Sequence, residues 1–198
     1  MNLVERAKNI IISPKTEWEA IANEEPNIQQ IIVGYVVPLA VISALASFIG
    51  YGLVGVPFLG AMVSWGIAQA IIVICTALLS VFIAAFVVDA LAPSFGSQKN
   101  TGRAIQLVAF SMTPVWVAGI LNILPTLGWL SSLIGLYGLF LLYLGLTPLM
   151  KTPEDKKIGY LVVSIIILIV VYAVLMAILS AILLAIFGLS LLSAMSSY

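Results

Sequence analysis

The eight Lys and Arg and the eight Asp and Glu residues of this chain all lie in three short segments, at 5–25, 89–103 and 151–157. The stretches between and after these segments are uncharged and hydrophobic. Each is long enough to cross a hydrocarbon layer of about 30 Å, which takes roughly 20 helical residues at about 1.5 Å each. Only 8% of the residues are charged, against about 25% in soluble domains. The sequence therefore predicts an integral membrane protein.

The hydrophobic pattern predicts an all-α, polytopic membrane protein with a five-span transmembrane helical bundle. Residues 1–27 are predicted to form an arm of short amphipathic cytoplasmic helices, and 28–198 the transmembrane domain. We place the spans at about 28–53, 60–91, 104–124, 128–150 and 158–192.

The distribution of charge predicts the orientation. An even number of predicted crossings separates each charged segment from the next, so that every Lys and Arg falls on one face. Basic loops mark the cytoplasmic face, and we expect the N-terminus in the cytoplasm and the C-terminus outside. A re-entrant hairpin in place of two spans would leave the charges on the same face, and only segment length argues against it.

Composition also excludes several classes of function. The sequence has no histidine, which removes the Ser-His-Asp relay, the HExxH metal site and the imidazole proton shuttle. Its single cysteine, Cys75, allows no internal disulfide and no thiolate zinc site. Net charge is zero, so that no basic stripe for nucleic acid is expected. We expect a protein that is not an enzyme and that uses no cofactor or metal ion.

The predicted arm has two amphipathic helices. Residues 2–12 place apolar side chains on one helical face, and Ser13 followed by Pro14 is typical of an N-cap and first helical residue. Trp18 is a candidate anchor at the membrane interface. The arm either binds partners or senses curvature, or it covers the inner ends of the spans.

Asp89 is the one carboxylate inside a predicted span. Placing it in hydrocarbon costs on the order of 2.5 to 3.5 kcal/mol, and the carboxyl end of a helix disfavours an anion. We expect a structural ion pair with Lys99 or Arg103, with a proton- or ion-handling role as the alternative.

A second polar group is predicted in mid-bilayer. Pro114 should kink its span and free the carbonyl of Phe110. We expect Gln69 to face the bundle interior near Ser111, Thr113 or that carbonyl, as a clasp between helices or as part of a substrate pathway.

Other positions carry narrower predictions. Asn122 should satisfy a turn at the outer end, and Trp129 should anchor span four at the interface. Thr152 and Pro153 are typical of the start of the last helix. Small residues at 60, 64 and 68 permit close helix packing.

Several apolar motifs, in order, resemble the Yip family of Ypt/Rab GTPase-interacting integral membrane proteins and their prokaryotic relatives. They are Thr113-Pro114-Val115-Trp116, Leu124-Pro125-Thr126-Leu127-Gly128-Trp129, Leu141-Leu142-Tyr143-Leu144-Gly145 and the lysine-bearing loop up to Gly159 and Tyr160. The segment Ser13, Pro14, Glu17 and Trp18 is similar to the prokaryotic branch, and 91–96 lacks the Asp-Leu-Tyr-Gly-Pro type motif of eukaryotic members.

This resemblance implies five spans and a cytoplasmic N-terminus. In eukaryotic members it further implies roles in vesicle budding and docking, through small GTPases and other family members. By family analogy alone, a small GTPase is a partner. We expect the plasma membrane of a bacterium or archaeon.

Two functions are compatible with the sequence. The first is a non-enzymatic membrane-organising protein that recruits partners, itself or other membrane proteins, through the arm and the loops at 93–103 and 151–157. The second is a small transporter, channel or lipid-moving protein with an interior polar path past Gln69, Thr113 and Asp89. The second requires a hydrated cavity in mid-bilayer, whereas the first predicts a dry, small-residue interior.

Overall fold

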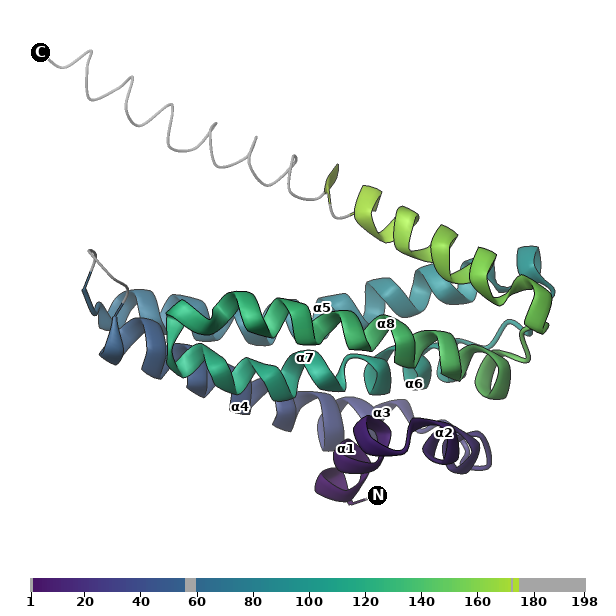
Figure 1. The fold of residues 1–198 in the computed structure, drawn as a ribbon, viewed down its shortest axis with the longest axis horizontal. Helices are drawn as coiled ribbons and strands as arrows, with labels where there is room; N and C mark the ends of the chain where they lie inside the picture. The colour runs from purple at the N-terminus through teal and green to yellow at the C-terminus, as the bar shows by residue number, and fades with distance from the viewer. Residues whose placement is uncertain (1, 56–59, 172, 175–198) are drawn as a thin grey trace, which may run out of the picture. The chain divides into compact units, whose positions relative to one another are not determined.

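The computed structural model describes residues 2–55, 60–171 and 173–174 (Figure 1). The chain divides into two compact units, Met1–Leu161 and Val162–Tyr198. The described residues of the second unit are helical. All contacts discussed below lie within the first unit, which is built of helices as predicted.

The arm consists of α1 (Leu3–Ile12) and α2 (Pro14–Ala22). The side chain of Asn2 accepts hydrogen bonds from the first backbone amides of α1, and Pro14 begins α2. Pro14 fits there because the first turn of a helix needs no amide donor. Ser13 occupies the N-cap position as predicted, although its side chain makes no capping hydrogen bond.

The first span is one helical run, Ile28–Val54, with two wider π-helical turns. It comprises α3 (Ile28–Ile31), η1 (Ile32–Val36), α4 (Val37–Phe48) and η2 (Ile49–Val54). The turn η1 ends two residues before Pro38, which has no amide hydrogen and whose ring crowds the preceding turn. A π-turn relieves that crowding without ending the helix.

Three further candidate spans follow within the described residues, at Val63–Phe95, Thr101–Ile123 and Pro125–Met150. Their elements are α5 (Val63–Leu91), η3 (Ala92–Phe95), α6 (Thr101–Ser111), α7 (Thr113–Ala118), η4 (Gly119–Ile123), η5 (Pro125–Leu127) and α8 (Gly128–Met150). After η6 (Glu154–Lys156) the chain is helical again over 157–171. The four candidate spans agree with the first four predictions to within a few residues. Most of the fifth predicted span, 158–192, falls outside the described residues.

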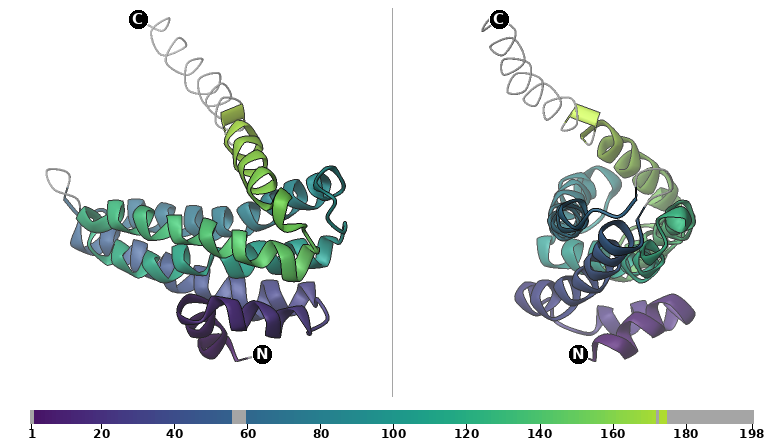
Figure 2. Two further views of the ribbon diagram at one scale, coloured as in Figure 1. Left: turned by 45° about the vertical axis from the view of Figure 1, so that its right-hand side comes forward. Right: turned by 90° about the vertical axis from the view of Figure 1, so that its left-hand side faces the viewer.

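Helices α4 to α8 run side by side, and the arm lies along them (Figures 1 and 2). Helix α4 packs on α5, α6 packs between α5 and α8, and α7 packs on α4 and α8. In the arm, α2 contacts α8, whereas α1 contacts α6 and α7.

Two glycines allow the first two spans to approach closely. A Cβ atom added to Gly66 would lie 2.6 Å from the Cα of Gly52. Gly60, one of the small residues expected to do this, has open space around it and precedes α5. The predicted mode of packing therefore occurs at Gly66 rather than at Gly60.

The third span is interrupted where Pro114 predicts a kink. Helix α6 ends at Ser111 and α7 begins at Thr113. Pro114 cannot donate to the carbonyl of residue 110, which breaks the hydrogen-bond ladder at this point.

Candidate functional site

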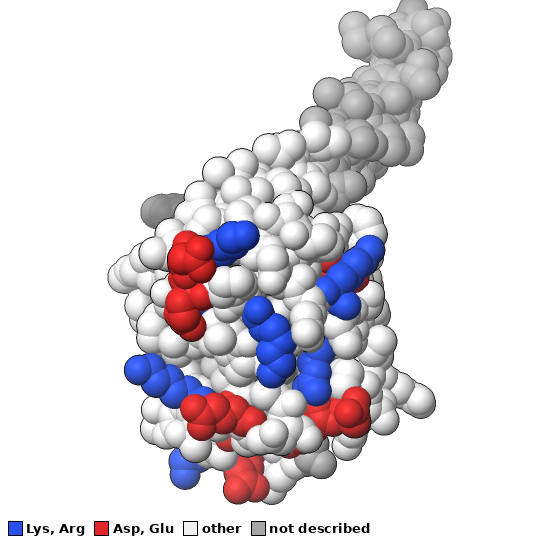
Figure 3. All heavy atoms as spheres, turned by 90° about the vertical axis from the view of Figure 1, so that its right-hand side faces the viewer, with Lys and Arg blue, Asp and Glu red and all other residues white. Residues whose placement is uncertain are grey.

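The charged side chains gather at one end of the bundle, which we call the charged end (Figure 3). Here the carboxyl end of α5, the amino end of α6 and the carboxyl end of α8 meet. The backbone amide of Gln98 donates to the backbone carbonyl of Met150 at 2.8 Å, and the Ser97 hydroxyl donates to Thr152 Oγ1 at 2.9 Å. These bonds tie the loop after α5 to the loop after α8.

Thr152 caps the carboxyl end of α8 rather than the start of the next helix. Its hydroxyl donates to the carbonyl of Leu146 at 3.1 Å and is buried. The last turn of a helix has carbonyls without intrahelical donors, and Thr152 satisfies one of them. The predicted N-cap is therefore wrong, because the hydroxyl is already used by the preceding helix.

Glu154 is held at the surface of this loop. Thr147 Oγ1 donates to Glu154 Oε1 at 2.9 Å, and Lys157 Nζ lies 3.3 Å from Oε2. The Thr147 hydrogen bond, with the nearby Lys157 charge, holds the pKa of this carboxyl below its usual value. Lys157 also lies 4.3 Å from the centre of the Tyr143 ring, a cation–π distance.

Asp89 is buried at the charged end, with 6% of its surface exposed. Thr101 Oγ1 donates to its Oδ2 at 2.8 Å, and its Oδ1 has no hydrogen-bond partner among the described residues. The expected ion pair with Lys99 or Arg103 is not formed in that part of the chain. Arg103 turns instead toward the arm, and Lys99 is exposed.

Arg103 joins α6 to the end of α2. Its Nη1 donates to the carbonyls of Ile21 at 3.2 Å and Glu24 at 2.8 Å. A cation is favourable at the carboxyl end of a helix, so Arg103 both neutralises that end and fixes the arm. The same nitrogen donates to Gln106 Oε1 at 3.1 Å.

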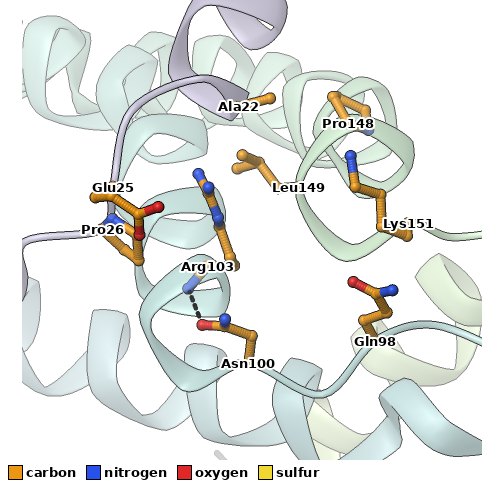
Figure 4. A pocket seen from close by; sticks show the side chains of 9 residues that line it. All are labelled: Ala22, Glu25, Pro26, Gln98, Asn100, Arg103, Pro148, Leu149 and Lys151. Atoms are coloured by element: carbon orange, nitrogen blue, oxygen red, sulfur yellow. Dashed lines mark hydrogen bonds between the residues drawn. The ribbon is translucent and has the colours of Figure 1, made fainter.

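A pocket of about 260 Å³ opens beside Arg103 (Figure 4). Arg103 and Lys151 approach it from opposite sides, and Glu25 lies across from Lys151. Its lining is formed by Ala22, Glu25, Pro26, Gln98, Asn100, Arg103, Pro148, Leu149 and Lys151. The arm, the loop before α6 and the end of α8 thus share one polar hollow.

A second polar cluster joins the two arm helices and makes one contact with the bundle. Arg6 Nη1 lies 2.7 Å from Glu17 Oε1, Nη2 pairs with Glu24, and the guanidinium lies 5.6 Å from the centre of the Phe110 ring. Arg6 is 8% exposed. The apolar periodicity of residues 2–12 gives no signal for this role, because the partners of Arg6 lie beyond its own helix.

The carbonyl that is freed at the kink in the third span accepts a hydrogen bond from a nearby side chain. Thr113 Oγ1 donates to the carbonyl of Phe110 at 2.7 Å, and the Tyr35 hydroxyl lies 2.7 Å from the same Oγ1. Since Thr113 has only one proton, Tyr35 donates to it. A tyrosine inside an apolar span was the only signal for this contact in the sequence.

Gln69 does not take part in this cluster. It is half-buried, and it makes none of the expected hydrogen bonds to Ser111 or Thr113 within the described residues. Asn122 reaches across to the first span, donating to Ser47 Oγ at 3.3 Å. It therefore joins two helices rather than closing a turn.

The two tryptophans named as anchors differ. Trp18 is 1% exposed and packs edge-on against Phe110, with ring centres 6.4 Å apart. It is a core residue between arm and bundle, which does not fit an interface anchor. Trp129 is exposed at the start of α8.

The chemistry available here is that of binding and packing. Within the described ranges, no group of three His, Cys, Asp or Glu side chains could hold a metal ion. The interior near the kink is filled by fully buried side chains, among them Tyr35, Phe110, Leu107 and Leu141. The helices define a multi-pass membrane protein.

The comparison with known families gives this class a name. The Yip1 domain family model matches residues 8–176. The chain belongs to this family, as the order of its apolar motifs predicts. No curated protein and no solved structure matches the chain.

Proposed function

We propose that this Yip1-domain protein is a non-enzymatic membrane organiser that recruits partners at its charged end. In this proposal the protein lies in the plasma membrane of a bacterium or archaeon, with five spans and the charged end in the cytoplasm. The partners are other membrane proteins or further copies of the chain. A small GTPase enters only through family analogy.

One observation carries the proposal, namely the gathering of charged side chains at one end of a bundle whose helices otherwise expose large apolar side chains (Figure 3). Specific recognition of a protein partner needs polar and charged groups in a fixed arrangement. The hydrogen bonds of Arg103 to the carbonyls of Ile21 and Glu24, and the pocket in Figure 4, fix such groups there.

Two measurements test this proposal. The first is cysteine labelling in intact cells, in a Cys75→Ala background with a single new cysteine at 99 or at 156. Both positions should stay unlabelled by an impermeant reagent until the membrane is opened. Labelling of one position from outside would contradict the five-span orientation.

The second measurement is reconstitution into liposomes, with ion-flux and lipid-scrambling assays. A scaffold should give neither activity above the level of empty liposomes. Flux that disappears with Gln69→Leu would contradict the proposal and favour a transporter.

The second candidate function, a small transporter or lipid-moving protein, has one observation in its favour. Asp89 Oδ1 is buried without a hydrogen-bond partner in the described part of the chain, and a buried unsatisfied carboxylate oxygen is costly. A proton or a cation would satisfy it. If Asp89→Asn keeps the protein folded but abolishes a measured flux, this function replaces the first.

A further inference from the structure

Helix α1 lies alongside the bundle rather than beyond its end. The Tyr137 hydroxyl donates to the backbone carbonyl of Ile11 at 2.9 Å, and Arg6 lies over the ring of Phe110. Tyr137 is thirteen residues from the end of α8, and Phe110 is nine residues from the start of α6. At about 1.5 Å per residue, these contacts lie roughly 20 Å and 14 Å from the charged end.

The arm covers helix surface that would otherwise face lipid. Every residue of α6 from 104 to 111 is buried. By contrast, α4, α5, α7 and α8 each expose large apolar side chains. Because α1 packs on α6 and α7, and α2 packs on α8, the arm takes the place of lipid along this side.

The outward faces of the two arm helices differ in polarity. Helix α1 exposes Val4 at 71% and Ile12 at 67%, with the exposed Lys8 between them and the exposed Glu5 beside Val4 in the first turn. At spacings of four, Val4, Lys8 and Ile12 form one stripe opposite the buried face. Helix α2, which Arg103 ties to the charged end, exposes mainly polar residues instead: Lys15, Thr16, Glu19 and Ala20.

The lengths of the spans set the depth of α1. The run Pro125–Met150 has 26 residues, or about 39 Å of helix, against about 30 Å of hydrocarbon. If the whole surplus of about 9 Å projects at the charged end, the α1 contacts lie roughly 5–11 Å inside the hydrocarbon. Interfacial amphipathic helices are buried by about 5–10 Å.

We propose that α1 is embedded in the lipid leaflet next to the charged end. Val4 and Ile12 contact acyl chains, and Lys8 extends its ammonium group up to headgroup phosphates while its methylene stem stays in the apolar layer. The stripe Val4, Lys8 and Ile12 is thus a lipid-binding surface, and only α2 remains in the aqueous phase. This replaces the expectation of an arm that is cytoplasmic throughout. It requires only a membrane-spanning bundle and is independent of partner recruitment.

Depth-dependent fluorescence quenching tests this proposal. The native cysteine is removed by Cys75→Ala, and single cysteines are introduced by Val4→Cys, Ile12→Cys and Glu19→Cys for labelling with an environment-sensitive fluorophore. The Ile71→Cys variant, on an exposed face of α5, supplies the reference for lipid contact. All four positions are on the surface, so the substitutions remove no buried contact. Each labelled protein is reconstituted into phosphatidylcholine vesicles with or without brominated acyl chains.

Positions 4 and 12 should resemble position 71, with blue-shifted emission and at least about twofold stronger quenching by brominated chains than position 19. Aqueous iodide should quench position 19 most. If positions 4 and 12 are quenched by iodide as strongly as position 19 and are insensitive to brominated chains, the proposal is wrong.

Discussion

Between the charged end and the middle of the bundle, side-chain polar groups and buried aromatic rings tie the helices together, through Arg6, Tyr35 and Thr113. Toward the other end, the same helices are held by close approach of their backbones. Gly66 lies against Gly52 there, and a Cβ atom on Gly119 would lie 2.5 Å from Ser43 Oγ.

The difference between these two regions has a physical cause. In hydrocarbon no hydrophobic force brings helices together, so that close packing of small residues is the main attraction. At the charged end the arm adds a second layer, which buries Trp18 and Ile10 and shields ion pairs from water. Destabilising substitutions near the charged end should therefore release the arm, whereas those at the other end should separate the helices.

The largest effect is expected from breaking the ion pair that joins the two arm helices. Arg6→Met removes the partner of the largely buried Glu17, together with the cation over the Phe110 ring of the bundle, and should weaken arm docking by about 3 kcal/mol. Trypsin should then cut after Lys15 roughly a hundredfold faster in detergent micelles. Lys8→Met, on the exposed face of the same helix, is the matched control. Equal cleavage rates in the two variants would contradict the assigned role of Arg6.

A smaller effect is expected from crowding the other end. Gly66→Ala places a methyl group 2.6 Å from the Cα of Gly52 and should lower the free energy of unfolding by about 2 kcal/mol. Gly34→Ala is the control, because its nearest neighbour would be a flexible Gln30 atom at 3.8 Å. Denaturant titration in micelles compares the two. The arm should stay docked in the Gly66→Ala protein, which trypsin can verify.

An effect of intermediate size is expected from removing the Thr113 hydroxyl at the kink. Thr113→Val leaves the Phe110 carbonyl and the Tyr35 hydroxyl without their partner and should cost about 1–2 kcal/mol of unfolding free energy. Thr113→Ser keeps the hydroxyl and should cost less. If the serine and valine variants are equally stable, the hydroxyl does not hold the kink.

The smallest effect concerns the loop after α8. The pKa of Glu154 is lowered in the folded protein, so that its stabilising contribution is present above its unfolded pKa and is lost as pH falls through the folded value. The melting temperature of the native protein should exceed that of Glu154→Gln at about pH 6, and the difference should shrink as pH falls below the unfolded glutamate pKa of about 4.3. If the difference between the two melting temperatures does not change with pH, ionised Glu154 does not stabilise the fold.

Several features of this protein could be predicted from the sequence. The first four spans were placed to within a few residues, because bilayer thickness sets the length of an uncharged helix. The arm helices followed from apolar periodicity and from Pro14. The family followed from the order of apolar motifs, which a match over residues 8–176 confirms.

The partners of individual side chains could not be predicted in the same way. Asp89 pairs with Thr101 rather than with a cation, Trp18 is buried rather than anchored at the interface, and Gln69 stands apart from Thr113. Each outcome depends on which helices are neighbours and how each is rotated. The chemistry of a single residue determines neither the neighbours of its helix nor the rotation of that helix.

The sequence by itself determined that this is a multi-pass membrane protein, where its first long apolar helices lie, and that charged side chains gather at one end of the bundle. Hydrocarbon thickness and the cost of desolvating charge act on local composition, and composition is visible in the sequence. Only the tertiary structure decided which faces meet, since a lipid-facing surface is as apolar as a buried one. Two such features are the rotation of α5 that brings Gly66 to Gly52 and the position of α1 beside Phe110. Neither can be predicted from the periodicity of apolar residues in the sequence.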